Sequence, residues 1–261
     1  MHSSKPYVVP LGVAAALPEG DAANSYLAVV REGRYWLIDC ADSPITRLQR
    51  AGLDPLMVQG VIITHFHPDH VYGLPAFLLG LFLLRAYQDR LPVPPLPIYA
   101  RPEVLTQVRG MVALFEQQGW LDEMAILYHA VPAEVGAEVA TDDDFRITAA
   151  PTKHSTPSLA VRFERRDTGA AFVYSSDTAP CSAIRTLARD AALLFHEATG
   201  ESVTHTTPAA AGALAAEVGA ERLILIHYHN DAETMSQLLP EAQSAFDGPV
   251  ALAKELQPYV W

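Results

Sequence analysis

The chain has 261 residues, of which half are hydrophobic and 18% are charged, and its formal net charge is −12 at pH 7. This length supports a large buried core, and the composition excludes a disordered or low-complexity chain. An acidic surface repels nucleic-acid phosphates and anionic membranes, so the charge disfavours nucleic acid and membrane as partners. We expect one α/β domain over residues 1–261.

The N-terminal region and the cysteines indicate where the protein works. The apolar run from Leu11 to Leu17 resembles the core of a signal peptide, but Pro10 and Pro18 bracket it, which disfavours export. The two cysteines, Cys40 and Cys181, lack CxxC spacing, so we predict buried free thiols, with neither a disulfide nor a thiolate zinc site. We therefore expect a cytoplasmic protein.

Short apolar, β-branched runs alternate with helical patterns along the chain, which is typical of an α/β fold. Ser43-Pro44 predicts the start of a helix that stops at Gly52, and Thr207-Pro208 predicts another that stops at Gly219. The runs that look buried on both faces are Tyr35–Ile38, Val61–Thr64, Leu193–Phe195 and Leu223–Ile226.

An interval of 84 residues separates His70 from His154. It holds an apolar helix over Leu74–Leu84, a proline-rich connector, and a second helix from Pro102 to about Gly119. The apolar run is well short of the ~20 residues that cross a bilayer. We predict a buried or subunit-contacting helix, in a block that shapes the substrate site.

Several predicted strands end in a histidine or an acid. Such groups follow or close the strands at His65, Asp177, His196-Glu197 and His227. Because open α/β sheets bind ligands in the crevice at the carboxyl ends of their strands, we expect these side chains to form one site.

The segment Thr64-His-Phe-His-Pro-Asp-His70 places three imidazoles and one carboxylate within six residues, directly after a predicted buried strand. These groups suit zinc, manganese or iron, and neighbouring side chains in so tight a loop can face two different ions. A solvated polar loop is the alternative, but crowded imidazoles repel one another when protonated. The segment therefore predicts a metal site.

The pattern His65-x-His67-x-Asp69-His70 resembles the signature of the metallo-β-lactamase superfamily. Further segments resemble its ribonuclease Z-like branch, and the resemblance covers nearly the whole chain: Asn24-Ser25, Leu37–Cys40, Thr152–Pro157, Tyr174–Thr178, Phe195–Thr199, Thr204–Pro208 and Leu225–His227. It implies a hydrolase with the four-layer αββα sandwich of that family, an α/β fold with two sheets face to face.

The resemblance also implies a dinuclear metal centre. It assigns one metal ion to His65, His67 and His154, the other to Asp69, His70 and His227, and makes Asp177 the bridge between them. Zinc is the expected metal, and manganese or iron would accept the same ligands. A water held by both ions would act as hydroxide, oriented by Asp69.

Three of these ligand assignments have structural alternatives. His154 could be an ordinary loop histidine, and Asp177 could cap the helix that follows Pro180. His229, two residues after His227 on the same strand face, could replace it as the ligand. Their order along the chain favours the metal-binding interpretation.

Glu197 and His205 are the candidate general-acid pair. A sugar alkoxide leaves poorly unless it is protonated, and an imidazole held by a carboxylate can supply that proton. Related branches that hydrolyse lactams or thioesters do not use this pair. The alternative is a strand-end carboxylate beside an unrelated turn histidine.

The chain departs from ribonuclease Z enzymes that process transfer-RNA precursors, which carry a long RNA-gripping arm before the bridging aspartate. Only 23 positions separate His154 from Asp177 here, and a hairpin uses all of them. We therefore predict a phosphodiesterase for a small or cyclic phosphodiester, and a homodimer, as related enzymes often form. The alternatives are a carboxylic-ester, lactone or sulfate-ester hydrolase, a transfer-RNA 3′-end endonuclease, and a non-catalytic metal-binding accessory protein.

Overall fold

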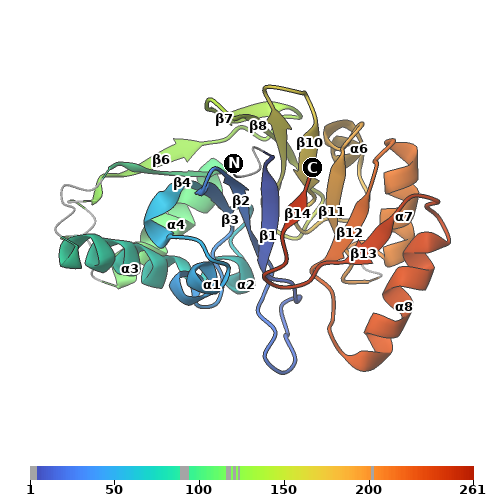
Figure 1. Cartoon of the computed structure of the whole chain (residues 1–261), viewed down its shortest axis with the longest axis horizontal. Coiled ribbons are helices and arrows are strands. Elements are labelled where there is room, and N and C mark those ends of the chain that lie inside the picture. Colours follow the sequence, from blue (N-terminus) through green and yellow to red (C-terminus); the bar gives the residue numbers. More distant parts are fainter. Residues whose placement is uncertain (1–4, 89–93, 116–118, 120–121, 123, 201–202) are drawn as a thin grey trace. The chain divides into compact units, whose positions relative to one another are not determined.

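The computed structural model describes residues 5–88, 94–115, 119, 122, 124–200 and 203–261. The chain forms two compact units, each built on one seven-stranded sheet (Figure 1). The first unit comprises residues 1–12, 25–130 and 255–260, and the second comprises residues 13–24, 131–254 and 261. A single domain over residues 1–261 stays a prediction.

The sheet of the first unit is mixed, with strand order β14-β1-β2-β3-β4-β5-β6. Neighbours pair antiparallel from β14 to β3 and parallel from β3 to β6. Because β3 and β4 run in the same direction, the residues that follow them emerge at the same edge of the sheet. The strands are β1 (Tyr7–Gly12), β2 (Tyr26–Arg31), β3 (Arg34–Ile38), β4 (Val58–Ile62), β5 (Leu96–Ala100), β6 (Ile126–Ala130) and β14 (Tyr259–Val260).

Proline occupies the first or second position of every described helix in the first unit. Its fixed φ suits a first turn, where its missing N–H is not needed. Gly52, at φ +75°, ends the first helix as predicted, although Ser43 makes no side-chain cap. The helices are α1 (Pro44–Arg50), the 3₁₀ helix η1 (Pro55–Met57), α2 (Pro68–Val71), α3 (Leu74–Tyr87) and α4 (Pro102–Leu114).

The apolar helix is longer than predicted. Together, α2 and α3 form a 20-residue stretch, Pro68–Tyr87, with a mean hydropathy of 1.3, which is long and apolar enough to cross a membrane. Half of this stretch is buried, however, and Phe77 and Leu78 belong to the hydrophobic core of the first unit. The helix is therefore partly buried in the core, and the predicted contact with another subunit stays a prediction. The following helix, α4, ends at Leu114, before the predicted Gly119.

The sheet of the second unit is also mixed, with strand order β13-β12-β11-β10-β9-β8-β7. Neighbours pair parallel from β13 to β10 and antiparallel from β10 to β7. Every residue of β10, β11 and β12 is buried, as expected of central strands. The strands are β7 (Ala137–Thr141), β8 (Phe145–Pro151), β9 (Leu159–Arg165), β10 (Ala171–Tyr174), β11 (Leu193–Glu197), β12 (Leu223–Ile226) and β13 (Val250–Leu252).

Helices of the second unit pack on its sheet and on each other. The helix α6 (Ser182–Leu187) contacts β8 and β9, and α7 (Pro208–Glu217) contacts β11 and β12. The side chain of Thr207 accepts a hydrogen bond from Ala210 N, and Gly219 has φ +69°, so both predicted ends of α7 are confirmed. The last helix, α8 (Ala232–Gln243), packs against α7 and β13 (Figure 1).

The interval between His154 and Asp177 is fully described, and it holds the predicted hairpin. β9 and β10 pair antiparallel across the turn at residues 166–170, and no arm extends from them. Both cysteines are free thiols, as predicted. The prediction that both are buried is wrong for Cys181, which is partly exposed because it stands just before α6.

Candidate metal centre

The loop between β4 and α2 gathers the metal-ligand candidates of the first unit. His65 is fully buried, and its Nε2 lies 3.1 Å from Nδ1 of His67. Two nitrogens bound to one tetrahedral zinc lie about 3.3 Å apart, because each Zn–N bond is about 2.0–2.1 Å long. Asp69 and His70 follow on α2, with Asp69 Oδ2 3.4 Å from His70 Nε2. The loop therefore offers two pairs of closely spaced donor atoms.

Asp39, which directly follows β3, orients two of these histidines. Its fully buried carboxylate accepts hydrogen bonds from Thr64 N (2.7 Å), Thr64 Oγ1 (2.8 Å) and His70 Nδ1 (2.8 Å). The Thr64 hydroxyl donates its proton to Asp39, so the Thr64 oxygen accepts from His65. The distance from His65 Nδ1 to this oxygen is 3.0 Å. Both imidazoles are thereby held with the Nε2 lone pair available to a metal ion.

Burial raises the pKa of the Asp39 carboxyl, while the His70 imidazole and the Thr64 donors oppose that rise. Removing a carboxylate from water is costly unless its oxygens are hydrogen-bonded, and the three bonds to Asp39 meet that need. The sequence analysis assigned Asp39 no role. The sequence feature that could have identified Asp39 is an acid at the end of a buried strand. That strand runs parallel to the strand before the metal loop.

Asp177 is the centre of the candidate ligands in the second unit. It lies just beyond β10 and is nearly fully buried. Its Oδ2 is 3.8 Å from His154 Nε2, and its Oδ1 is 3.5 Å from His227 Nε2. The two oxygens thus face two different imidazoles, as a carboxylate that bridges two ions would. The helix that follows is preceded by Cys181 as its N-cap residue, so Asp177 does not cap it.

The two histidines that face Asp177 are held through their Nδ1 atoms. His154 Nδ1 donates to the carbonyl of Thr204 at 3.1 Å. Thr199 Oγ1 donates to the His227 carbonyl at 2.8 Å and therefore accepts from His227 Nδ1, also at 2.8 Å. Each Nε2 consequently carries the lone pair that could bind a metal ion. His229 is exposed, whereas His227 is buried beside Asp177.

His227 adopts a left-handed backbone conformation, with φ +52°. Its N–H donates to the Val13 carbonyl, and Ala15 N donates to the Tyr228 carbonyl, so the loop 13–24 is paired with the segment after β12. The Asn230 side chain closes this contact by exchanging two 2.9 Å hydrogen bonds with the Glu19 backbone. None of these neighbours of His227 was predicted from the sequence.

Glu197 and His205 form a hydrogen-bonded pair. Glu197 is fully buried at the end of β11, and its Oε1 accepts from His205 Nδ1 at 2.9 Å. Its carboxylate also accepts from the backbone N–H groups of Thr178 (3.1 Å) and Thr199 (2.9 Å). The imidazole of His205 is 21% exposed, so part of the ring is accessible to solvent.

His205 also lies among the ligand candidates. Its ring centroid is 5.0 Å from that of His154 and 6.1 Å from that of His227. Ligand atoms of Asp177, His205 and His227 all lie within 4.8 Å of one another. The geometry is therefore compatible with a proton donor beside the metal ions and with an additional metal ligand.

The donor set of each unit fits a divalent metal ion, since imidazole nitrogens and carboxylate oxygens are what zinc, manganese and iron accept. A family model described as "Beta-lactamase superfamily domain" matches residues 34–228. The chain belongs to the β-lactamase superfamily. The match spans both the metal loop and His227.

Curated relatives place the chain in the ribonuclease Z-like part of this superfamily. The protein named Ribonuclease Z from Salinibacter ruber is 30% identical over an alignment of 308 positions, gaps included, which covers 97% of this chain and 93% of that protein. The Ribonuclease Z of Methanothermobacter thermautotrophicus is 27% identical and covers 90% of this chain and 91% of its own length. The predicted family resemblance is confirmed.

Solved structures share the fold. The metallo-β-lactamase fold protein YhfI from Bacillus subtilis has a TM-score of 0.84 at 22% identity and covers 98% of this chain and 100% of its own. The short form of human tRNase Z has a TM-score of 0.76 at 22% identity, with 97% and 98% covered. The predicted α/β class, the metallo-β-lactamase fold, is confirmed, and family membership identifies the chain as a metal-dependent hydrolase.

Several other polar residues of the chain make contacts within their own unit. Arg162 donates to the carbonyls of Leu187 and Arg189, and Arg165 pairs with Asp167 in the hairpin turn. Exposed His129 stacks on Tyr99 in the first sheet. Burial lowers the pKa of His196, and its Nδ1 lies 2.8 Å from the Glu197 carbonyl oxygen. Lys153 is exposed, and its backbone pairs with Ala179.

Proposed function

We propose that the protein is a dinuclear metal-dependent phosphodiesterase that acts on a small or cyclic phosphodiester. The observation that carries this proposal is the Glu197–His205 pair beside Asp177 and His227. An alkoxide leaves poorly from a phosphodiester unless it is protonated, and an imidazole held by a carboxylate can supply that proton.

The proposed ligand sets combine residues of both units. His65, His67 and His154 would hold one ion, Asp69, His70 and His227 the other, with Asp177 shared between them. Zinc is the proposed metal, because the set is dominated by imidazole. The ions, when bound, lower the pKa of a shared water and polarise the phosphate oxygens.

The residues of the chain then perform the positioning and proton transfer. Asp69, which is 9% exposed, accepts a hydrogen bond from the attacking water and directs it at phosphorus. His205 donates its Nε2 proton to the departing oxygen, and Glu197, bonded to its Nδ1, keeps the ring oriented and stabilises its charged form. The backbone N–H groups of Thr178 and Thr199 hold that carboxylate in place for this task.

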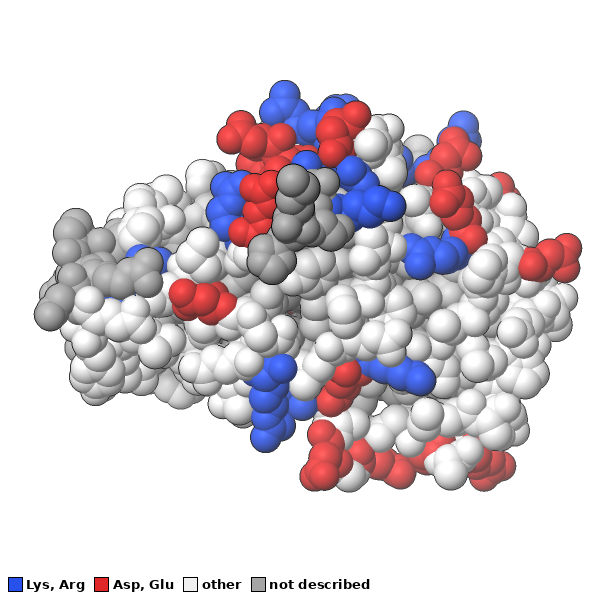
Figure 2. Space-filling model, viewed as in Figure 1, with Lys and Arg blue, Asp and Glu red and all other residues white. Residues whose placement is uncertain are grey.

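Three observations support a small substrate. The hairpin of β9 and β10 carries no arm that would grip RNA. The alignment with the Salinibacter protein runs over 308 positions, so that relative has residues with no counterpart among the 261 here. On the face drawn in Figure 2, acidic and basic side chains alternate without a continuous basic surface, consistent with the net charge of −12.

A second candidate is a ribonuclease. It is favoured by the curated relatives, several of which are named Ribonuclease Z at 26–30% identity over most of the chain. An RNA substrate that binds without a gripping arm would have to be short, because binding of a long RNA relies on many phosphate contacts. A short oligoribonucleotide therefore belongs in the substrate panel beside cyclic and dinucleotide phosphates.

The test is turnover by protein whose zinc, manganese and iron content has been measured by mass spectrometry. We expect hydrolysis of bis(p-nitrophenyl) phosphate that exceeds hydrolysis of p-nitrophenyl acetate and of a simple lactone, and that is lost in Asp69→Ala. Turnover of only the acetate, the lactone or an aryl sulfate would replace the proposal with an ester or sulfate-ester hydrolase. Metal-loaded protein without any turnover would indicate an accessory protein.

We also propose that the chain forms a homodimer in the cytoplasm. Large apolar side chains of the first unit that are exposed include Tyr87 and Phe115. Exposed apolar groups of this kind often become covered by another subunit. Light scattering at micromolar concentration should give twice the 28.3 kDa of one chain, and a monomer would contradict the proposal.

A further inference from the structure

An apolar pocket of about 430 Å³ opens in the first unit between the metal loop and α4. Phe66, Pro68, Val71 and Tyr72 line it from the loop and α2, and Gln107, Met111 and Leu114 line it from α4. Small-molecule sites have this size and this composition, with mostly apolar walls and a few polar groups.

The walls of the pocket include apolar side chains that are open to solvent. Leu114 is 83% exposed and Tyr72 is 47% exposed, whereas Phe66 and Met111 pack partly against the core. Keeping this surface in water costs free energy that the burial of an apolar group would recover. A ligand group that covers these side chains is therefore favoured by the hydrophobic effect.

The position of the pocket connects it to the candidate metal ligands. Phe66 stands between His65 and His67 in the chain, and Val71 directly follows His70. Consecutive Cα atoms are about 3.8 Å apart, so the wall begins within one residue of the ligands. The wall of the pocket is therefore formed in part by the chain neighbours of residues that we propose to hold the phosphodiester.

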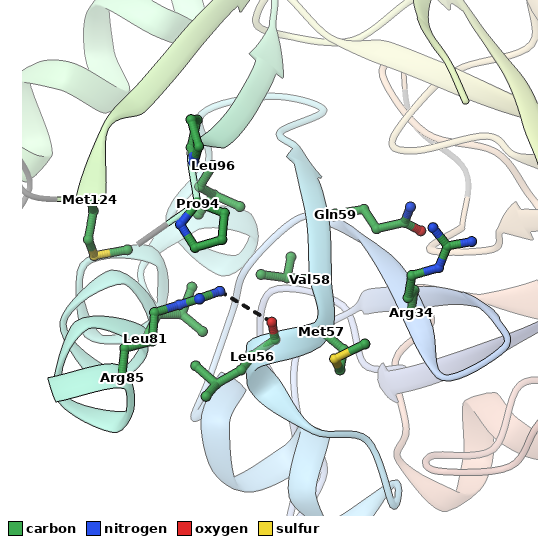
Figure 3. A pocket seen from close by; sticks show the side chains of 11 residues that line it. Arg34, Leu56, Met57, Val58, Gln59, Leu81, Arg85, Pro94, Leu96 and Met124 are labelled. Atoms are coloured by element: carbon green, nitrogen blue, oxygen red, sulfur yellow. Dashed lines mark hydrogen bonds between the residues drawn. The ribbon is translucent and has the colours of Figure 1, made fainter. Parts of the chain in front are cut away.

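A second cavity of the first unit lacks this connection. It has a volume of about 250 Å³, and Arg85 crosses it to donate to the Leu56 carbonyl at 3.3 Å (Figure 3). Val58 and Leu96, which begin β4 and β5, line it. It therefore lies at the amino ends of these parallel strands, whereas the metal loop follows the carboxyl end of β4.

We infer that the pocket between Phe66 and Met111 binds an apolar substituent of the substrate, so that the enzyme prefers phosphodiesters with an aryl or large alkyl group. This inference rests on the proposed function and names its substrate class. Gln107 supplies an amide at the rim that can hydrogen-bond to a polar atom on such a group.

The test is calorimetric binding of diphenyl phosphate and of dimethyl phosphate to the zinc-loaded protein. The anions carry the same charge and differ in apolar area, so wild-type protein should bind diphenyl phosphate about tenfold more tightly. The double variant Met111→Gln with Leu114→Gln should reduce this preference to about twofold or less. The matched control is Leu127→Gln, an exposed leucine on β6 that does not line the pocket, and it should retain the full preference.

Equal affinity of the wild-type protein for the two anions, or no binding of diphenyl phosphate, overturns the inference. The inference is also overturned if the double variant keeps the preference and light scattering shows it to be a monomer where the wild type is a dimer. That result would mean that a second copy of the chain covers the pocket. The binding preference needs no turnover, so it is separate from the proposed function, which fails if metal-loaded protein hydrolyses no phosphodiester.

Discussion

The two units hold their candidate metal ligands in different ways. In the first unit, four ligands come from one six-residue segment, and a single buried carboxylate, Asp39, orients two of them directly or through Thr64. In the second unit, His154, Asp177 and His227 come from three separate segments of the chain. Their imidazoles are oriented by a backbone carbonyl and a hydroxyl instead of a charged group.

This difference predicts unequal sensitivity to substitution. One change in the first unit, at Asp39, affects several ligands, because the local network has one centre. In the second unit each orienting contact serves one ligand, so single changes should have smaller and separable effects on metal binding. The second unit alone supplies the Glu197–His205 pair, so the largest effects on chemistry should arise there.

The largest expected effect is on turnover. His205→Ala should slow hydrolysis of a diester with a sugar-alkoxide leaving group by about 10²–10³-fold, since a positioned general acid contributes that much. Hydrolysis of bis(p-nitrophenyl) phosphate should change little, because nitrophenolate leaves without a proton. Steady-state rates on both substrates, with metal content measured by mass spectrometry, check this prediction.

The metal content decides between the two roles of His205. Two ions per chain in His205→Ala would support a proton donor, whereas loss of an ion would make His205 a ligand, as its closeness to Asp177 and His227 permits. Glu197→Gln should slow hydrolysis with the same dependence on the leaving group, and its loss of rate should be smaller than that of His205→Ala. Glu217→Gln, an exposed acid on α7 in the same unit, is the matched control.

The next largest effect concerns Asp39. Asp39→Asn should weaken zinc affinity by about 100-fold, because an outer partner that orients metal-binding histidines contributes about 10–100-fold. It should also lower the free energy of unfolding by about 1–3 kcal/mol, since buried donors lose a charged acceptor. Competition with a chromophoric chelator and thermal melts measure the two effects.

Asp54→Asn provides the control for Asp39, because Asp54 is an exposed acid of the same unit that accepts a hydrogen bond from Leu56 N. Its metal affinity should equal that of the wild type. If Asp39→Asn bound zinc as tightly as the control, Asp39 would not be the common centre that orients the metal ligands of the first unit.

Thr199 offers the corresponding test in the second unit, with a smaller expected effect. Thr199→Val removes the hydroxyl that accepts from His227 Nδ1, and metal affinity should fall by about tenfold, the lower end of the range for such partners. Thr199→Ser keeps the hydroxyl and should restore the affinity. A loss as large as that of Asp39→Asn would remove the contrast between the units.

The metal loop could be predicted from the sequence because its ligands are neighbours in the chain. The pattern His65-x-His67-x-Asp69-His70 needs no tertiary structure to be recognised, and buried strands such as Leu223–Ile226 are visible as continuous apolar runs. Asp39 could not be assigned a role in this way. Its contact with Thr64 depends on the parallel pairing of β3 and β4, which hydrophobic periodicity does not specify.

Contacts between distant segments set the other limit of sequence analysis. Thr199 reaches His227 across 28 positions, and Asn230 reaches Glu19 across 211. Element ends were also missed where packing decided them, as in the apolar helix that continues to Tyr87. The pairing of Glu197 with His205 was accessible because both lie close together after one strand.

The smallest expected effect concerns Asn230, which tests whether the loop 13–24 helps to hold His227. Asn230→Ala removes both hydrogen bonds to Glu19, which are exposed, so metal affinity should fall by only about threefold. Faster hydrogen exchange over residues 15–22 should accompany this loss, because the loop would remain attached mainly through the backbone of Val13 and Ala15. Asp231→Ala, which removes the neighbouring cap of α8, should weaken stability without changing either readout. If Asn230→Ala left metal affinity unchanged while exchange of the loop rose, the position of His227 would not depend on the Asn230–Glu19 contact. The dispersed contacts of the second unit would then be independent of one another.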